Sequence, residues 1–202
     1  MDDLEAAFQW ISTLRKKHSP NADIWGLRRD WKHIKEGMLA QLNDGSYQFG
    51  LLDRLEFEDA TISLWCSQDM IVLKLISQAL GQRMEGHIPK SCYHVKGHGG
   101  LKKGVADTYE ALSEHQYVMR SDIKGYYSSI RFDVLMEIIQ SYVKHPVLLT
   151  LIGKACRRTE TRGGIFYDFD EKGIPKGSPL SPLLGAVTPW TQKGINIGSF
   201  LF

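Results

Sequence analysis

The sequence predicts an α+β fold in which helices dominate, because helical spacing of apolar residues covers most of the chain and β-rich runs are few. Of its 202 residues, 43% are hydrophobic and 24% are charged, which is typical of a globular chain and excludes wholesale disorder. Apolar runs fall far short of the roughly 20 residues that span a bilayer, and the acidic N-terminus lacks a secretory pattern. With three widely spaced cysteines, these features predict a cytoplasmic protein with reduced thiols and no membrane partner.

Helical patterns account for most of the first half of the chain. Leu4, Phe8 and Ile11 lie at helical spacing. We expect Thr61 or Ser63 to cap a later helix, which would end at Gly81. The helices predicted here span residues 4–17, 27–42, 61–80 and 105–114, with a glycine-rich loop over 86–104 before the last of them.

The pattern changes in the second half of the chain. Gln116–Met119 (QYVM) predicts a short strand that ends before Asp122. Residues 132–143 are amphipathic and predict a helix, and a further apolar stretch begins at Pro146. Residues 161–172 predict a hairpin or an extended arm.

Two segments carry residues suited to chemistry. In Arg120–Ile130 (RSDIKGYYSSI), an acid follows the predicted strand and two tyrosines come soon after it. A carboxylate at a strand end can reach a magnesium ion while the strand fixes its direction. The plainer interpretation is a strand–turn–helix connection with a surface Asp and buried tyrosines.

The second segment, Gly173–Val187, contains the run GIPKGSPLSPLLGAV. Gly177 permits a close approach of the backbone to a ligand, and Ser178 and Ser181 are able to cap a helix. A proline-rich helix entry without a ligand is the alternative.

In this order and spacing, the two segments resemble the polymerase palm of reverse transcriptases, in particular the group II intron and bacterial retroelement branch. RSDIKGYYSSI is similar to the first palm motif, D-I-K-x-Y-[FY]-x-x-I, and GIPKGSPLSPLLGA to the next, G-[IV]-P-[QK]-G-[SC]-x-L-S-P-L-L. The resemblance implies helix-rich fingers and an incomplete polymerase palm. It divides the chain into an N-terminal helical segment, a fingers-like region, a partial palm and a divergent tail, at residues 1–60, 61–115, 116–187 and 188–202.

The resemblance also implies roles for individual residues. Asp122 would be the catalytic carboxylate and a ligand of Mg²⁺, and the Ile123 carbonyl would face a second Mg²⁺. Tyr127 would stack under the sugar of the incoming deoxynucleotide triphosphate and exclude a 2′-hydroxyl. The remaining nucleotide-binding residues would be Pro175, Lys176 and Gly177. An RNA template and a DNA primer would be the partners, and two-metal nucleotidyl transfer would be the reaction.

The third palm motif of the family, [YF]-x-D-D, does not occur in this sequence, and no Asp or Glu follows Glu171. Two unit charges about 4 Å apart interact by roughly 4 kcal/mol at an effective dielectric of about 20, so one carboxylate cannot offset the repulsion between two Mg²⁺ ions. We therefore expect a truncated, inactive reverse-transcriptase fragment with an unpaired palm strand and exposed apolar surface.

Net charge does not identify the partner, because the formal charge is only +2. Between Glu85 and Asp107, however, there is no acidic residue. We expect the lysines of this stretch to contact a nucleic-acid backbone; they are Lys90, Lys96, Lys102 and Lys103. A solvated loop without a ligand is the alternative. Two alternatives to a polymerase remain, a non-catalytic RNA-binding module and a defective retroelement remnant.

Overall fold

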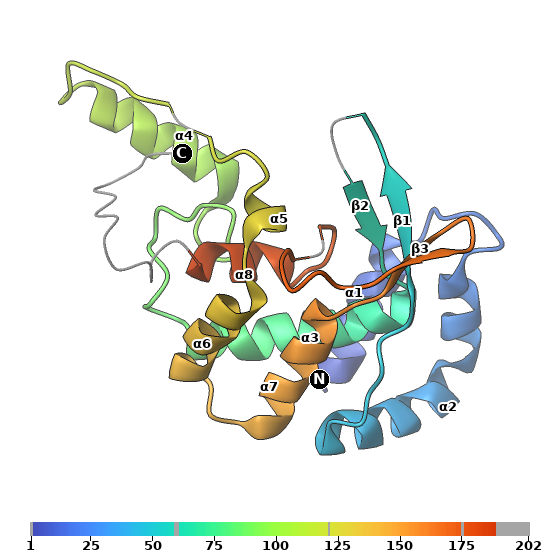
Figure 1. Cartoon of the computed structure of the whole chain (residues 1–202). Coiled ribbons are helices and arrows are strands. Elements are labelled where there is room, and N and C mark those ends of the chain that lie inside the picture. Colours follow the sequence, from blue (N-terminus) through green and yellow to red (C-terminus); the bar gives the residue numbers. More distant parts are fainter. Residues whose placement is uncertain (1, 59–60, 121, 175, 189–202) are drawn as a thin grey trace.

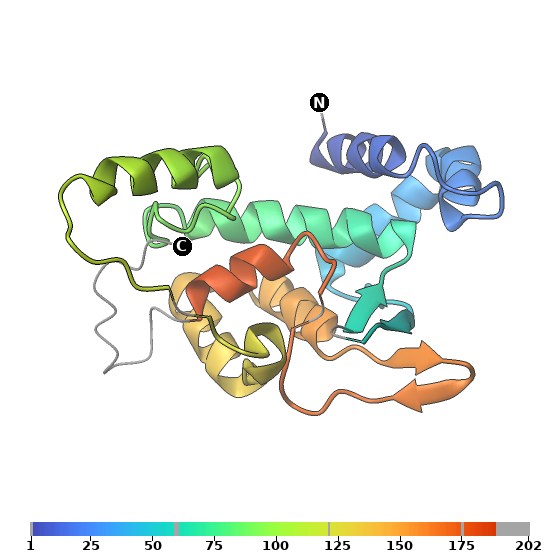
Figure 2. The same ribbon diagram turned by 90° about the horizontal axis from the view of Figure 1, so that it is seen from above.

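Helix α3 (Ser67–Arg83) runs across the middle of the molecule (Figures 1 and 2). This computed structural model describes residues 2–58, 61–120, 122–174 and 176–188. The apolar run of α3 is buried from Met70 to Leu73, because helices from both halves of the chain contact it. These helices are α1 (Asp3–Leu14), α2 (Asp23–Asp44) and α7 (Pro146–Cys156).

The two N-terminal helices are confirmed, with ends that differ from the predicted ones by a few residues. Asp2 caps α1 by accepting a hydrogen bond from the Leu4 N–H at 3.1 Å. Gly45 ends α2 in a left-handed conformation, with φ 75°. The Phe8 and Trp31 rings stack at 4.1 Å between centroids and join the two helices.

The helix predicted over 61–80 is wrong at its start. Residues Thr61–Leu64 form strand β2, and α3 begins only at Ser67. The N-cap is Cys66 and not Thr61 or Ser63: its sulfur accepts a hydrogen bond from the Asp69 N–H at 3.4 Å. Pairing with a neighbouring strand overrides the helical pattern at this position, and the helix continues past Gly81 to Arg83.

The sheet is small and mixed, with strand order β2-β1-β3-β4. β1 (Leu52–Glu56) pairs antiparallel with β2 and parallel with β3 (Glu160–Arg162). β4 (Ile165–Tyr167) completes the hairpin predicted over 161–172. The sheet thus joins segments that are far apart in the sequence, across three parts of the proposed four-part division, which stays a prediction.

The helices of the second half follow the amphipathic pattern. α6 (Phe132–Tyr142) packs against α7, and both bury their apolar faces. The predicted loop is present up to Gly99, but α4 begins a few residues earlier than expected. The remaining helices are α4 (Gly100–Leu112), α5 (Tyr126–Ser129) and α8 (Ser181–Val187). Among the residues described, none of the helices is both long and apolar enough to cross a membrane.

The strand predicted over Gln116–Met119 is wrong. This segment has no strand partner among the described residues, and its side chains are exposed, with Tyr117 at 88%. A lone extended segment gains no ladder hydrogen bonds, so its β-rich residues alone do not make a strand. Val118, Met119 and the nearby Ile123 are likewise exposed apolar side chains.

Candidate nucleotide-binding site

Asp122 lies in an exposed stretch before α5 and not at the end of a strand. Its carboxylate makes no hydrogen bond or ion pair with any described residue. The neighbouring Ile123 is also exposed, and its carbonyl accepts a hydrogen bond from the Tyr126 N–H at 3.3 Å. That carbonyl, predicted to face a metal, thus takes part in the turn that starts α5.

The two tyrosines lie where the two sequence motifs meet. Gly125, at φ 67°, turns the chain into α5. The Tyr126 hydroxyl donates a hydrogen bond of 2.5 Å to the Gly185 carbonyl in α8. The Tyr127 carbonyl accepts one of 2.9 Å from the Ile174 N–H. Burial raises the pKa of Tyr126 to about 12 and also raises the pKa of Tyr127, so both phenols are neutral at physiological pH.

The loop that carries the second motif is held from both ends. The Gly173 N–H donates to the Ile130 carbonyl at 2.7 Å. Gly177, at φ 90°, passes so close to β2 that an added Cβ would lie 3.3 Å from the Ser63 carbonyl oxygen. The Ser178 hydroxyl accepts hydrogen bonds from the Leu180 and Ser181 N–H groups just before α8. The N-cap of α8 is Leu180, however, so the prediction of Ser178 or Ser181 as the cap is wrong. Pro175 lies outside the described residues.

A cavity of about 390 Å³ forms between this loop, α5 and α1. Tyr127, Lys176 and Gly177, which the sequence predicts to bind a nucleotide, all line it. Lys176 is the one charged side chain among the described residues of the lining. The other lining residues are mostly apolar: Trp10, Leu14, Met70, Ser178, Pro179, Ser181 and Pro182. The cavity therefore offers an apolar wall and one cation.

Lys74 on α3 and Trp10 on α1 belong to the surroundings of this cavity and were missed in the sequence. The Lys74 ammonium lies 4.9 Å from the centroid of the Trp10 ring, a cation–π contact. Burial lowers the pKa of Lys74, and the charge of Lys96 lowers it further. The charge of Lys96 thus reaches Lys74, which contacts the cavity-lining residue Trp10.

The other lysines predicted to bind nucleic acid lie in the loop before α4 and on α4 itself, all exposed. Lys103 forms an ion pair with Asp107 at 2.9 Å. Lys90, Lys96 and Lys102 form no ion pair with a described residue, so their charges are available to a polyanion.

The described residues do not fit a complete two-magnesium site. They contain no group of three or more His, Cys, Asp or Glu side chains that could hold a metal ion. Asp122 does not line the Tyr127–Lys176 cavity. This region therefore offers one carboxylate where two-metal transfer requires several.

Comparison with known proteins finds similarity at the level of the fold. No protein-family model matches the sequence, and no curated protein matches it. Similar solved structures include a partial Cas6-RT-Cas1–Cas2 complex and a Cas6-RT-Cas1–Cas2 complex, in which RT denotes a reverse transcriptase. Each match covers 90% of this chain with 17% identity and a TM-score of 0.55. The chain spans 32% and 20% of those chains, respectively. Its helix-rich α+β arrangement is compatible with part of a reverse-transcriptase fold.

Proposed function

We propose that this chain forms the fingers and partial palm of a reverse-transcriptase-type polymerase of the group II intron and retroelement branch. In this proposal it binds a deoxynucleotide triphosphate at the Tyr127–Lys176 cavity and an RNA template through exposed lysines. One observation carries the proposal: Tyr127 and the Lys176–Gly177 pair, distant in sequence, line the same cavity. The similarity of fold to chains of RT-containing complexes supports it.

Catalysis by the two-metal mechanism requires further carboxylates beside Asp122. Neither the described residues nor the remaining sequence after Glu171 supplies them. We propose that Asp122 and the Ile123 carbonyl hold Mg²⁺ only when another polypeptide segment contributes these acids. The chain by itself then binds nucleotide without extending a primer.

Binding of dTTP to the full chain tests the nucleotide site. Lys176→Gln is expected to weaken binding about ten-fold, because a charge-assisted hydrogen bond to a phosphate is lost. Tyr127→Ala is expected to reduce the ratio of the affinity for dTTP to the affinity for UTP. Lys32→Gln removes the same charge from an exposed position on α2 and serves as the control. Equal affinity of the Lys176→Gln variant and the unchanged chain for dTTP contradicts the proposal.

Primer extension on a poly-rA template tests the catalytic part. We expect no Mg²⁺-dependent product from this chain alone, with or without Asp122→Ala. A robust product that Asp122→Ala abolishes would show that the site is complete without added carboxylates.

A non-catalytic RNA-binding module is the second candidate, and the lysines without acidic partners favour it. Replacing Lys90, Lys96 and Lys102 by Gln is expected to weaken RNA binding. The slope of the logarithm of the binding constant against the logarithm of the salt concentration is expected to fall by about one per lysine. If RNA binding persists while dTTP binding is absent, this candidate replaces the polymerase proposal. Loss of both activities in the unchanged chain points to a defective remnant.

A further inference from the structure

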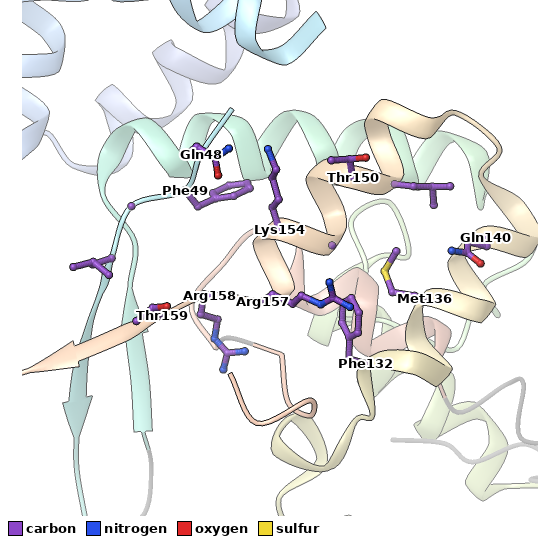
Figure 3. A pocket seen from close by; sticks show the side chains of 14 residues that line it. Gln48, Phe49, Phe132, Met136, Gln140, Thr150, Lys154, Arg157, Arg158 and Thr159 are labelled. Atoms are coloured by element: carbon purple, nitrogen blue, oxygen red, sulfur yellow. The ribbon is translucent and has the colours of Figure 1, made fainter. Parts of the chain in front are cut away.

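A second and larger cavity, of about 600 Å³, lies away from the sequence motifs (Figure 3). Its walls come from α6, from α7 with the residues that follow it, and from the extended segment 48–51 before β1. Its volume falls in the range of about 300–1,000 Å³ that is typical of small-molecule sites. The cavity does not include Tyr127, Lys176 or Gly177, so it is separate from the proposed nucleotide site.

The charge of this cavity is one-sided. Three cations line it, and no carboxylate does among the described residues. Arg158 is neutralised, because its guanidinium pairs with Glu160 at 3.0 Å and donates to the Cys156 and Gly173 carbonyls. Lys154 and Arg157 form no ion pair with a described residue, although the charge of Lys154 acts on Asp44.

Lys154 is fixed in place by backbone groups. Its ammonium donates hydrogen bonds to the Gly45 carbonyl at 2.9 Å and the Tyr47 carbonyl at 3.0 Å. These bonds orient the side chain without cancelling its charge. The nearby Asp44 accepts a hydrogen bond from the Ser46 N–H. Hydrogen bonds from Ser46 lower the pKa of Asp44, and the charge of Lys154 lowers it further, so Asp44 partly offsets this cation.

Arg157 is the most available cation in the cavity. Its guanidinium carbon lies 4.4 Å from the centroid of the Phe132 ring. Figure 3 shows the side chains of Arg157 and Phe132 next to each other. No hydrogen bond or ion pair joins the guanidinium N–H groups to a described residue, so they remain available to a ligand. An arginine with free N–H groups is suited to bind a phosphate through two parallel hydrogen bonds.

The rest of the wall suits a flat, partly apolar group. Phe132, Met136 and Leu149 supply apolar surface beside Arg157. Gln140 adds an amide that makes no hydrogen bond with a described residue, so it is free to pair with a ligand's polar edge. The Phe132 ring is in turn held edge-on by Phe169 at 5.6 Å, which fixes its orientation.

We propose that this cavity binds a nucleotide unit, with its phosphate on Arg157 and Lys154 and its base against the apolar wall near Gln140. The unit is either a free nucleoside monophosphate or one residue of a single strand. Both sources present the same chemistry, an anion joined to a planar ring. This site is independent of the Tyr127–Lys176 cavity and does not require polymerase activity.

Calorimetric titration of the full chain with thymidine 5′-monophosphate tests the site. Arg157→Gln is expected to weaken binding about ten-fold or more, because the bidentate charged contact is lost. Gln140→Glu, at an exposed helix position, is also expected to weaken binding, because it places a negative charge in a cavity that receives an anion. Arg29→Gln removes an equal charge from an exposed position on α2 and is expected to leave binding unchanged. Thermal melting of each variant verifies that it folds.

The arms of the titration separate the possible ligands. Tighter binding of a short oligothymidylate identifies a strand, and equal or weaker binding identifies a free nucleotide. Inorganic phosphate that binds as tightly as the nucleotide overturns the assignment, because the apolar wall then contributes nothing. Unchanged binding in the Arg157→Gln variant also overturns it. If thymidine 5′-monophosphate binding is lost in Lys176→Gln but kept in Arg157→Gln, the nucleotide binds at the Tyr127–Lys176 cavity. That result overturns the Arg157 site and leaves the proposed function intact.

Discussion

Two helices that both carry large apolar residues, α3 and α4, have opposite surroundings. α3 is covered by helices on several sides, and Leu80 in it is 0% exposed. α4 carries an apolar stripe (Leu101, Val105, Tyr109 and Leu112), and that stripe is exposed, with Leu101 at 82%. Figure 1 shows α4 projecting from the body of the molecule. Apolar spacing therefore predicts that a helix has an apolar face, and only tertiary contacts determine whether that face is buried.

The largest expected effect is at Leu80. Leu80→Ala removes a fully buried side chain and is expected to lower the free energy of unfolding by about 2–5 kcal/mol. Leu101→Ala makes the same chemical change on α4, where about 0.5 kcal/mol or less is expected. Urea denaturation measures both. A comparable loss at Leu101 would show that the α4 stripe is covered in solution and would break the comparison.

The next effect concerns a buried carboxylate on α3. Asp69 accepts hydrogen bonds from the Tyr47 hydroxyl at 2.7 Å and from the Gly50 N–H at 3.0 Å. Asp69→Ala leaves both donors unsatisfied and is expected to cost about 1–3 kcal/mol. Asp30→Ala, at a surface ion pair, is the control and is expected to have little effect. The hydrogen bonds of Asp69 hold Tyr47 and Gly50 against α3, and residues 48–51 form one wall of the Arg157 cavity. Asp69→Ala is therefore also expected to weaken ligand binding in that cavity.

Acidification gives a smaller effect at the junction of α1 and α2. The hydrogen bond from the Trp31 indole lowers the pKa of Glu5 below its ordinary value, with further contributions from Gln9 and Lys35. A carboxyl group with a lowered pKa stabilises the fold at neutral pH and loses that contribution as the pH falls through its folded pKa. The stability difference between the unchanged chain and Glu5→Gln is therefore expected to shrink below about pH 4.5. A difference that stays constant on acidification would contradict this assignment.

The smallest effect on stability is expected on the α4 stripe itself. Leu101→Gln combined with Tyr109→Gln removes exposed apolar surface without opening a cavity. The melting temperature is expected to stay unchanged while the concentration at which the chain associates rises. Light scattering measures this association. A lower melting temperature would show that the stripe packs against another part of the chain.

Much of the helical framework was predictable from the sequence, and the sheet was only partly so. The helices near Leu4, Phe132 and Pro146 follow from apolar spacing. β1 and β2 were missed, because their residues alternate weakly and acquire a strand identity only by pairing with each other and with β3. The opposite error occurred at Gln116–Met119, where β-rich residues find no neighbour to pair with.

The candidate site was predictable to the extent that it depends on two continuous motifs. Tyr127 and Lys176 were identified from those motifs and meet at one cavity. Arg157 was not identified, because its significance depends on the ring of Phe132 and on segment 48–51, which reach it only in the folded chain. Lys74 was missed for the same reason, since nothing in its local sequence indicates its contact with Trp10.

Gly185 packs against the Tyr127 ring, so a substitution at residue 185 changes the surroundings of Tyr127. A Cβ at this position would lie 3.1 Å from Cε1 of the Tyr127 ring and 3.3 Å from its hydroxyl oxygen. A single methyl group there would therefore crowd the Tyr127 ring and force a small shift of a side chain that lines the cavity. The size of residue 185 thus sets the room left for the Tyr127 ring, from within a helix whose first two residues, Ser181 and Pro182, line the same cavity.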